Sequence, residues 1–151
     1  MWNDKTWLGQ AISGTIWAFP VIETIHILAL TMMFGAIVII DLRMLGLGMK
    51  KQPVTVLAKN LEPYMTWGLV IMLATGYMLF TSEAMKCFVN DGFKFKMEAL
   101  FPAIIFQFTL FRWITHKDED KRPMALGWLV ALLSLILWFG VGVGGRAIGF
   151  V

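Results

Sequence analysis

Four long apolar runs divide the chain and leave few ways for it to fold. They cover residues 19–40, 63–83, 97–115 and 124–143, with charged and small residues in the segments between them. A helix of about 20 apolar residues is long enough to cross the hydrocarbon core of a bilayer. Each run approaches or reaches that length, so the sequence predicts four membrane-spanning helices.

The composition agrees with a membrane protein. Hydrophobic residues make up 58% of the 151 residues and charged residues 15%, with a mean hydropathy of +0.72, whereas ordinary soluble domains are about half apolar. We therefore predict an all-α integral membrane four-helix bundle, with residues 1–151 as a single transmembrane domain. One cysteine, Cys87, cannot form an intrachain disulfide or a cysteine-rich metal site. The net charge of +3 comes from basic residues between apolar runs, which indicates contact with the lipid bilayer and no nucleic-acid partner.

The segment ahead of the first run has the pattern of an interfacial helix. Its apolar residues are spaced so that an amphipathic helix would place indoles at the level of the lipid headgroups. They are Trp2, Trp7, Leu8, Ile12 and Trp17. The segment lacks a basic start and a small-residue cleavage site, so we do not expect a cleaved signal peptide.

Proline and turn residues mark the first two loops. Pro53 and Pro63 favour a separate short helix over 53–61, which begins at the first proline and ends before the second. The loop over 81–95 is expected to turn at Asn90, Asp91 and Gly92.

The distribution of lysine and arginine predicts the orientation. Eight of the 13 basic residues fall on one side of the membrane if the runs alternate in direction. They are Arg43, Lys50, Lys51, Lys59, Arg112, Lys117, Lys121 and Arg122. The richer side is normally cytoplasmic, so both termini are predicted to face outward, into the periplasm of a bacterium.

Two polar residues stand out within the first run. Glu23 and His26 are three positions apart, on one helix face, and Met33 lies seven positions beyond His26 on the same stripe. Lys96 and Arg146 fall on the same side of the membrane. Ionisable residues within a membrane usually face the interior of the bundle, so these residues are predicted to form a polar cluster.

A haem b is one cofactor that would fit this cluster. His26 would ligate the iron, Met78 or Met97 would lie at a similar depth as a sixth ligand, and Lys96 with Arg146 would receive the propionates.

A quinone is the second cofactor considered. Glu23 and His26 would exchange protons with it, and Trp67 or Trp138 would provide a wall for the ring. A purely structural role is the alternative to both cofactors: Glu23 reaches water or pairs with Arg146, and His26 hydrogen-bonds a neighbouring helix.

The other histidine and the methionines carry weaker signals. His116 ends the third run on the opposite side, roughly 20 Å in depth from His26, which argues against a haem between the two, and we expect it to be a solvated loop residue. Thioethers suit Cu(I), and His26 with Met33 is the candidate metal pair. The remaining methionines are more typical of adaptable apolar packing.

Several segments carry a resemblance to a known family. They are IWAFPVIETIHILALTMMFGAIVIIDLRMLG, NDGFKFKMEAL and the ending GRAIGFV. The chain resembles an uncharacterised family of small bacterial four-helix inner-membrane proteins, itself similar to the membrane domain of copper-resistance D proteins. The matching positions are Glu23, His26, Asp41, Arg43, Lys96, Gly145 and Arg146. The resemblance implies a bacterial inner-membrane location and lends weight to metal handling.

Three functions follow as hypotheses. The first is a redox membrane subunit that binds haem b or quinone within a larger complex. The second is a non-catalytic accessory subunit that packs against a membrane complex or forms a homo-oligomer, and the third is copper binding or transfer. No catalytic motif is present in the sequence, so activity as an enzyme on its own is not expected.

Overall fold

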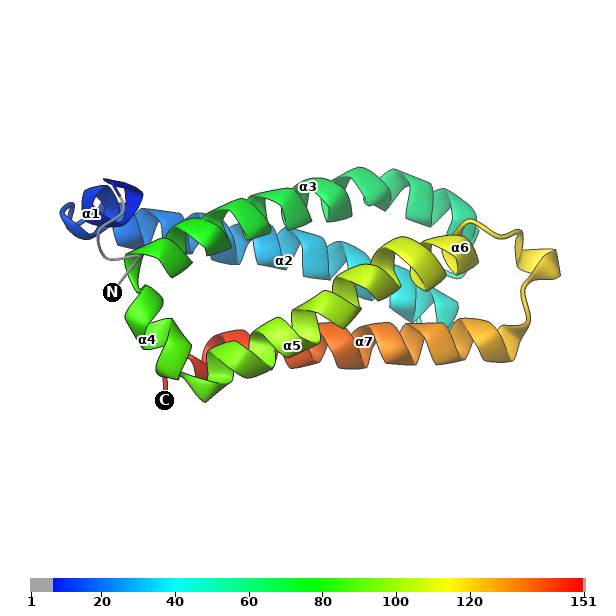
Figure 1. The fold of residues 1–151 in the computed structure, drawn as a ribbon. Helices are drawn as coiled ribbons and strands as arrows, with labels where there is room; N and C mark the ends of the chain where they lie inside the picture. The colour runs from blue at the N-terminus through cyan, green and yellow to red at the C-terminus, as the bar shows by residue number, and fades with distance from the viewer. Residues whose placement is uncertain (1–6, 151) are drawn as a thin grey trace.

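The structure, a computed structural model, describes residues 7–150 and consists of helices joined by short turns (Figure 1). The elements are α1 (Trp7–Ser13), α2 (Ala18–Met44), α3 (Val54–Ser82), α4 (Ala84–Val89), α5 (Asp91–Phe106), the π-helical turn η1 (Gln107–Phe111), α6 (Arg112–Thr115), the 3-10 turn η2 (Glu119–Lys121) and α7 (Met124–Ala147). α5, η1 and α6 are continuous and form one long helix over Asp91–Thr115. Together with α2, α3 and α7 it gives four helices long and apolar enough to cross a membrane. The predicted all-α membrane bundle is confirmed, and residues 7–150 contain no strand.

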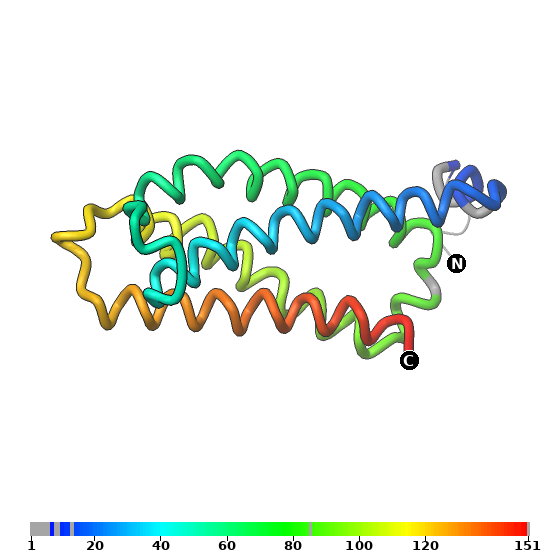
Figure 2. The backbone as a smooth tube through the Cα atoms, turned by 180° about the vertical axis from the view of Figure 1, so that it is seen from behind, coloured from blue at the N-terminus to red at the C-terminus, as the bar shows by residue number. Residues whose placement is uncertain are grey.

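The four spanning helices run up and down and define two ends of the molecule. Residues 7–17, 83–90 and 148–150 lie at one end, which we call the terminal end (Figures 1 and 2). The turns over 45–53 and 116–123 lie at the other, which we call the hairpin end. α2 packs along α3, and α5 along α7, and contact between α2 and α7 joins these two pairs. α3 approaches the third span mainly at α6, so the two pairs meet most closely toward the hairpin end.

α3 corrects the prediction of a separate helix over 53–61. It begins at Val54 and continues through Pro63 to Ser82 without a break. Pro63 has no N–H to donate and disturbs one turn, but spanning helices tolerate proline where neighbouring groups support the backbone. The first turns of α3 are anchored by Val54, Leu57 and Ala58, which are all buried.

The loop over 81–95 is shorter and more helical than expected. It contains α4, and α5 begins at Asp91, ahead of the predicted start at residue 97. Asn90 is the turn residue, as predicted: its side-chain oxygen accepts a hydrogen bond from the Phe93 N–H at 3.3 Å and so caps α5. Its amide also donates to the Ile148 carbonyl at 3.1 Å, which ties the start of α5 to the end of α7.

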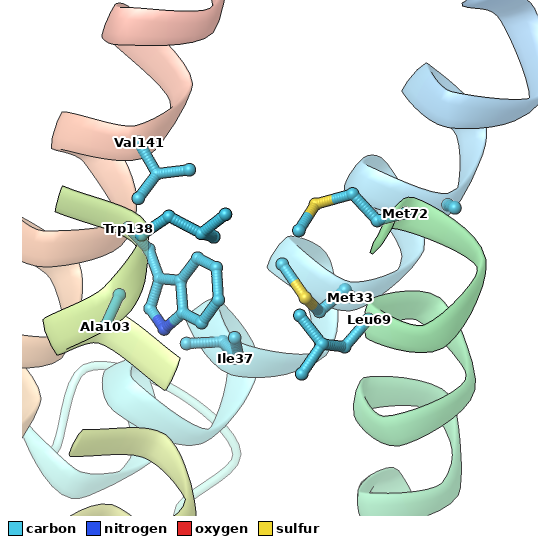
Figure 3. Packing of buried hydrophobic residues seen from close by; sticks show 9 residues of the cluster. Met33, Ile37, Leu69, Met72, Ala103, Trp138 and Val141 are labelled. Carbon is cyan, nitrogen blue, oxygen red and sulfur yellow. The ribbon is translucent and has the colours of Figure 1, made fainter. Parts of the chain in front are cut away.

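Two clusters of buried apolar side chains hold the helices together. The cluster in the middle of the bundle is drawn in Figure 3, where Met33, Leu69 and Met72 lie opposite Trp138 and Val141. A second cluster lies nearer the hairpin end and includes Ile40, Leu57, Phe111, Ile114 and Val130. Inside a bilayer such contacts stabilise the bundle through close packing, because lipid tails are as apolar as the side chains themselves.

The Glu119 carboxylate ties the hairpin end together. It lies 3.0 Å from Arg43 at the end of α2 and accepts a hydrogen bond of 2.9 Å from the Val54 N–H at the start of α3. Arg122, just before α7, lies 3.8 Å from the same oxygen. One carboxylate therefore connects α2, α3 and the turn into α7.

The predicted N-terminal helix is present as α1, over seven residues. Ile12 is buried against the bundle, while Trp7 is 79% exposed and Trp17 76% exposed. Trp2 and the Leu8 side chain lie outside the described residues. α1 thus has a packed face and an exposed indole beside the terminal end, as an interfacial helix requires.

Candidate functional site

His26 is half-buried on α2 and hydrogen-bonded to α3. Its Nδ1 lies 2.9 Å from the Thr75 hydroxyl, which is itself 2.6 Å from the Ile71 carbonyl. A hydroxyl has a single proton. When Thr75 donates that proton to the Ile71 carbonyl, the Thr75 oxygen accepts a hydrogen bond from the Nδ1–H of His26. The Nε2 atom is then the nitrogen of the imidazole that keeps a free lone pair.

The absence of a side chain at Gly76 makes room for the imidazole. A Cβ at this position would lie 3.2 Å from the His26 Cε1. Both the Nδ1 and Cε1 atoms of the ring therefore face α3.

Lys96 is the other half-buried member of the predicted cluster. It lies on α5 against α7, where a Cβ at Gly144 would be 3.1 Å from the Lys96 Cα. His26 and Lys96 are both half-buried, on spans that begin at the terminal end.

Glu23 and Arg146, the other two members of the predicted cluster, are on the surface of the bundle. Glu23 is exposed and forms no ion pair within residues 7–150, and Arg146 is exposed with its guanidinium 5.8 Å from the Phe150 ring. Met78 is half-buried on α3. The described residues contain no group of three or more His, Cys, Asp or Glu side chains placed to hold a metal ion.

The structure does not bring the candidate copper ligands together. His26 packs against Gly76, whereas a Cβ at Gly68 would lie 2.8 Å from the Met33 Cβ. The two side chains thus contact α3 at positions eight residues, roughly 12 Å, apart along that helix. Met33 belongs to the apolar cluster in the middle of the bundle.

A narrow cleft lies between α3 and the third span, nearer the hairpin end, with a cavity volume of about 20 Å³, which is room for about one water molecule. We call it the hairpin-side cleft. It is lined by Met33, Ile37, Glu62, Met65, Thr66, Leu69, Gln107, Phe108, Phe111, Arg112, Thr115, His116 and Trp138. Its walls are mostly apolar and aromatic with a few polar groups, which is the usual make-up of a small-molecule site.

Gln107 provides the polar group inside the cleft. The buried Trp138 indole donates to its side-chain oxygen at 3.3 Å, and its amide nitrogen lies 3.5 Å from the Met65 sulfur. The side-chain amide of Gln107 has two N–H groups. One faces the Met65 sulfur, and these two contacts give the other no acceptor. The indole fixes the orientation of the amide.

The π-helical turn places Gln107 and Phe111 on this wall. It covers Gln107–Phe111 within an otherwise α-helical span. Such turns are rare and occur frequently at functional sites. No feature of the sequence analysis predicted it.

The mouth of the cleft is charged. Glu62 pairs with Arg112 at 2.9 Å and with the His116 Nε2 at 3.3 Å. The His116 Nδ1 lies 2.9 Å from the Arg112 carbonyl. His116 lies in the turn after α6, as a loop residue was expected to, but its ring is half-buried against Glu62 and so is less solvated than expected.

The two tryptophans proposed as ring walls differ. Trp67 is 65% exposed and points away from the bundle, whereas Trp138 is 2% exposed and lines the cleft. The quinone site predicted around Glu23 and His26 thus lacks Trp67 as a wall, and the buried Trp138 indole lines the hairpin-side cleft.

The fold and the cleft define a small multi-pass membrane protein, a four-helix bundle with a site that opens between helices. The chain belongs to the DUF6644 family, described as a family of unknown function, whose model matches residues 1–151. No curated protein and no solved structure matches the chain.

Proposed function

We propose that this protein is a redox subunit of the bacterial inner membrane that binds a quinone or quinol ring in the hairpin-side cleft. The observation that carries the proposal is the Gln107 amide, held by Trp138 inside an aromatic cleft with one N–H free. A quinone carbonyl is a hydrogen-bond acceptor, and a buried donor without an acceptor costs free energy until a ligand supplies one.

The lining of the site suits a flat ring with an apolar tail, for which the side chains of the narrow cleft would have to move apart. Phe108, Phe111 and Trp138 line the cleft, and aromatic rings favour offset stacking or edge contacts with another ring. α3 approaches the third span mainly at α6, so an isoprenoid tail would leave toward the lipid between α3 and α5, where side chains and not backbones fill the space. The charged Glu62, Arg112 and His116 at the mouth suit the membrane surface.

The setting proposed is a larger membrane complex. Electron exchange with the quinone requires a partner that gives or takes electrons, so the protein would act as one subunit. The excess of basic residues at the hairpin end supports an orientation with that end in the cytoplasm and both termini in the periplasm.

Binding of a benzoquinone with a ten-carbon tail to protein in lipid nanodiscs tests the proposal. Quenching of tryptophan fluorescence gives the affinity, because the ring would lie beside Trp138. We expect Gln107→Leu to bind roughly 3- to 10-fold more weakly, the effect of one lost hydrogen bond. Thr109→Val is the matched control: Thr109 lies in the same π-helical turn, is exposed and donates to the Ile105 carbonyl.

Two results would overturn the quinone proposal. One is saturable quenching of equal strength in wild type, Gln107→Leu and Thr109→Val. The other is displacement of the quinone by phospholipid alone, which would make the cleft a groove for a lipid acyl chain.

A haem b at His26 is a second candidate, favoured by the Thr75 contact. Histidines that bind metals usually give their other ring N–H to a nearby acceptor, as Nδ1 of His26 does when the Thr75 oxygen accepts. Lys96 would then meet a propionate, and Met78 stays the predicted sixth ligand. A Soret band in purified protein that disappears in His26→Ala and persists in His116→Ala would establish this site. A colourless protein would remove it.

A copper site at His26 and Met33, a relation to copper-resistance D proteins and an accessory role without a cofactor stay predictions. Equal Cu(I) affinity in wild type and His26→Ala would remove the copper site.

A further inference from the structure

A carboxylic acid is fully buried one helical turn before the end of α2. Asp41 has no solvent exposure, and neither of its oxygens has a hydrogen-bond partner within residues 7–150. Ser134 on α7 lies at the same level of the bundle, because Ile37 and Trp138 share one buried cluster and Ile40 and Val130 share the other. Ser134 is also fully buried, and its hydroxyl is likewise without a partner in the described residues.

The charged groups nearest in the chain are engaged elsewhere. Arg43 binds Glu119 and the Gln52 carbonyl, and Arg122 lies against Glu119. No ion pair or hydrogen bond of the described residues includes the Asp41 oxygens. Apolar buried residues from all four spanning helices pack in the adjoining cluster, among them Ile40, Leu57, Ile114 and Val130.

An ionised carboxylate in this position would be unpaired in a largely apolar interior, which is strongly unfavourable. The cost disappears when the carboxylate holds a cation. Hard metal cations take about six oxygen ligands, and this site offers only three, two from the carboxyl group and one from the hydroxyl. A proton needs only one carboxyl oxygen to bind and one acceptor to bond to, so the site suits a proton better than a metal ion.

We propose that Asp41 and Ser134 form a buried binding site for a single proton, which is held on the Asp41 carboxyl. Ile37 lies four residues before Asp41 on α2, and Trp138 four residues after Ser134 on α7, and both line the hairpin-side cleft. The proton site is therefore one turn, about 6 Å, from the cleft along both helices. That distance places it to exchange a proton, through a water molecule, with a ligand whose oxygens are protonated and deprotonated.

Infrared spectroscopy of the protein without added ligand tests the site independently of what the cleft binds. A protonated carboxylic acid has a C=O stretch separate from carboxylate and amide bands, and it shifts down in D2O. We expect wild type to show this band at neutral pH. Labelling with ¹³C-aspartate should move it, which assigns it to aspartate without any mutation.

Three variants then assign the C=O band to a particular residue. It should be absent in Asp41→Asn and retained in Asp91→Asn, whose carboxylate is exposed and paired with Lys94. Ser134→Ala should shift its frequency, because the neighbouring hydroxyl is lost. A wild-type spectrum without the band, or a band retained in Asp41→Asn, would overturn the proposal. Loss of the wild-type band on addition of sodium chloride would also overturn it, in favour of a sodium site.

Discussion

At the level of single residues, a few polar side chains stand out in this bundle because they are buried or join several helices. Gln107 and Asp41 are buried in spanning helices, and Glu119 joins three helix ends. His26 was evident from the sequence because a histidine inside an apolar run is unusual. Gln107 gives a similar signal, an amide midway along the third run, but its partners Met65 and Trp138 come from other helices, and a single sequence does not reveal such contacts.

The contacts of the Glu119 carboxylate predict that removing its charge destabilises the protein. Glu119→Gln removes the charge that Arg43 and Arg122 share, and the side chain is 38% exposed, so solvent screens part of the effect. We expect the free energy of unfolding to fall by about 1 kcal/mol. Unfolding by SDS, followed by circular dichroism, measures it. Asp120→Asn, an exposed neighbour, is the control, and an equal loss in both variants would count against this role of Glu119.

Cys87 gives a prediction on pH. Burial and the nearby Glu83 raise the pKa of its thiol, while Lys96 and Lys86 act in the opposite direction. The reactive thiolate is therefore scarcer at neutral pH than in a free cysteine. Alkylation by iodoacetamide should speed up with rising pH to a midpoint above that of free cysteine. Glu83→Gln should lower the midpoint and Lys86→Gln should raise it; an unchanged midpoint in both would contradict this account of the thiol.

At the scale of elements, the helices form where the sequence predicts, but their ends and contacts depend on packing. The predicted break at Pro63 is absent because the first turns of α3 are buried against the other helices. The π-helical turn was not predicted, since its sequence, QFTLF, has nothing that separates it from an α-helix. The pairing of α2 with α3 rests on a small residue, as is common in membrane helices.

Gly68 is the residue that allows this close pairing. A Cβ there would lie 2.8 Å from the Met33 Cβ and 3.1 Å from the Ala29 carbonyl oxygen. Gly68→Ala should therefore push α2 and α3 apart and destabilise the bundle by about 1–3 kcal/mol. Gly35→Ala on α2 meets nothing within 4 Å, so it should be neutral or stabilise by up to about 1 kcal/mol through helix propensity. SDS unfolding curves compare the two, and a Gly68→Ala variant as stable as Gly35→Ala would show that the helices do not pack so closely.

At the scale of the whole molecule, four spans and a shared end for both termini follow from hydropathy and chain alternation alone. The location of the cleft does not, because it depends on which spans pack side by side. Four apolar helices of similar composition can be paired in several ways. In this structure α2 packs with α3 and α5 with α7, so α3 faces the third span at α6, where the cleft lies.

The predicted orientation is testable with a membrane-impermeant maleimide on intact cells. Cys87 lies at the terminal end, so it should react from the periplasmic side. Asp120→Cys in a Cys87→Ser background, at the hairpin end, should react only after the membrane is opened. The opposite pattern would reverse the orientation and place the basic hairpin end outside.

The central claim is that the hairpin-side cleft holds a quinone through Gln107. The measurement that tests it most directly is the quinone content, extracted with organic solvent, of protein purified in mild detergent from a bacterial membrane. The account predicts close to one quinone per chain in wild type and in Thr109→Val, and a clear reduction in Gln107→Leu. The same trace amount of quinone in all three proteins, with phospholipid as the bound molecule, would contradict it.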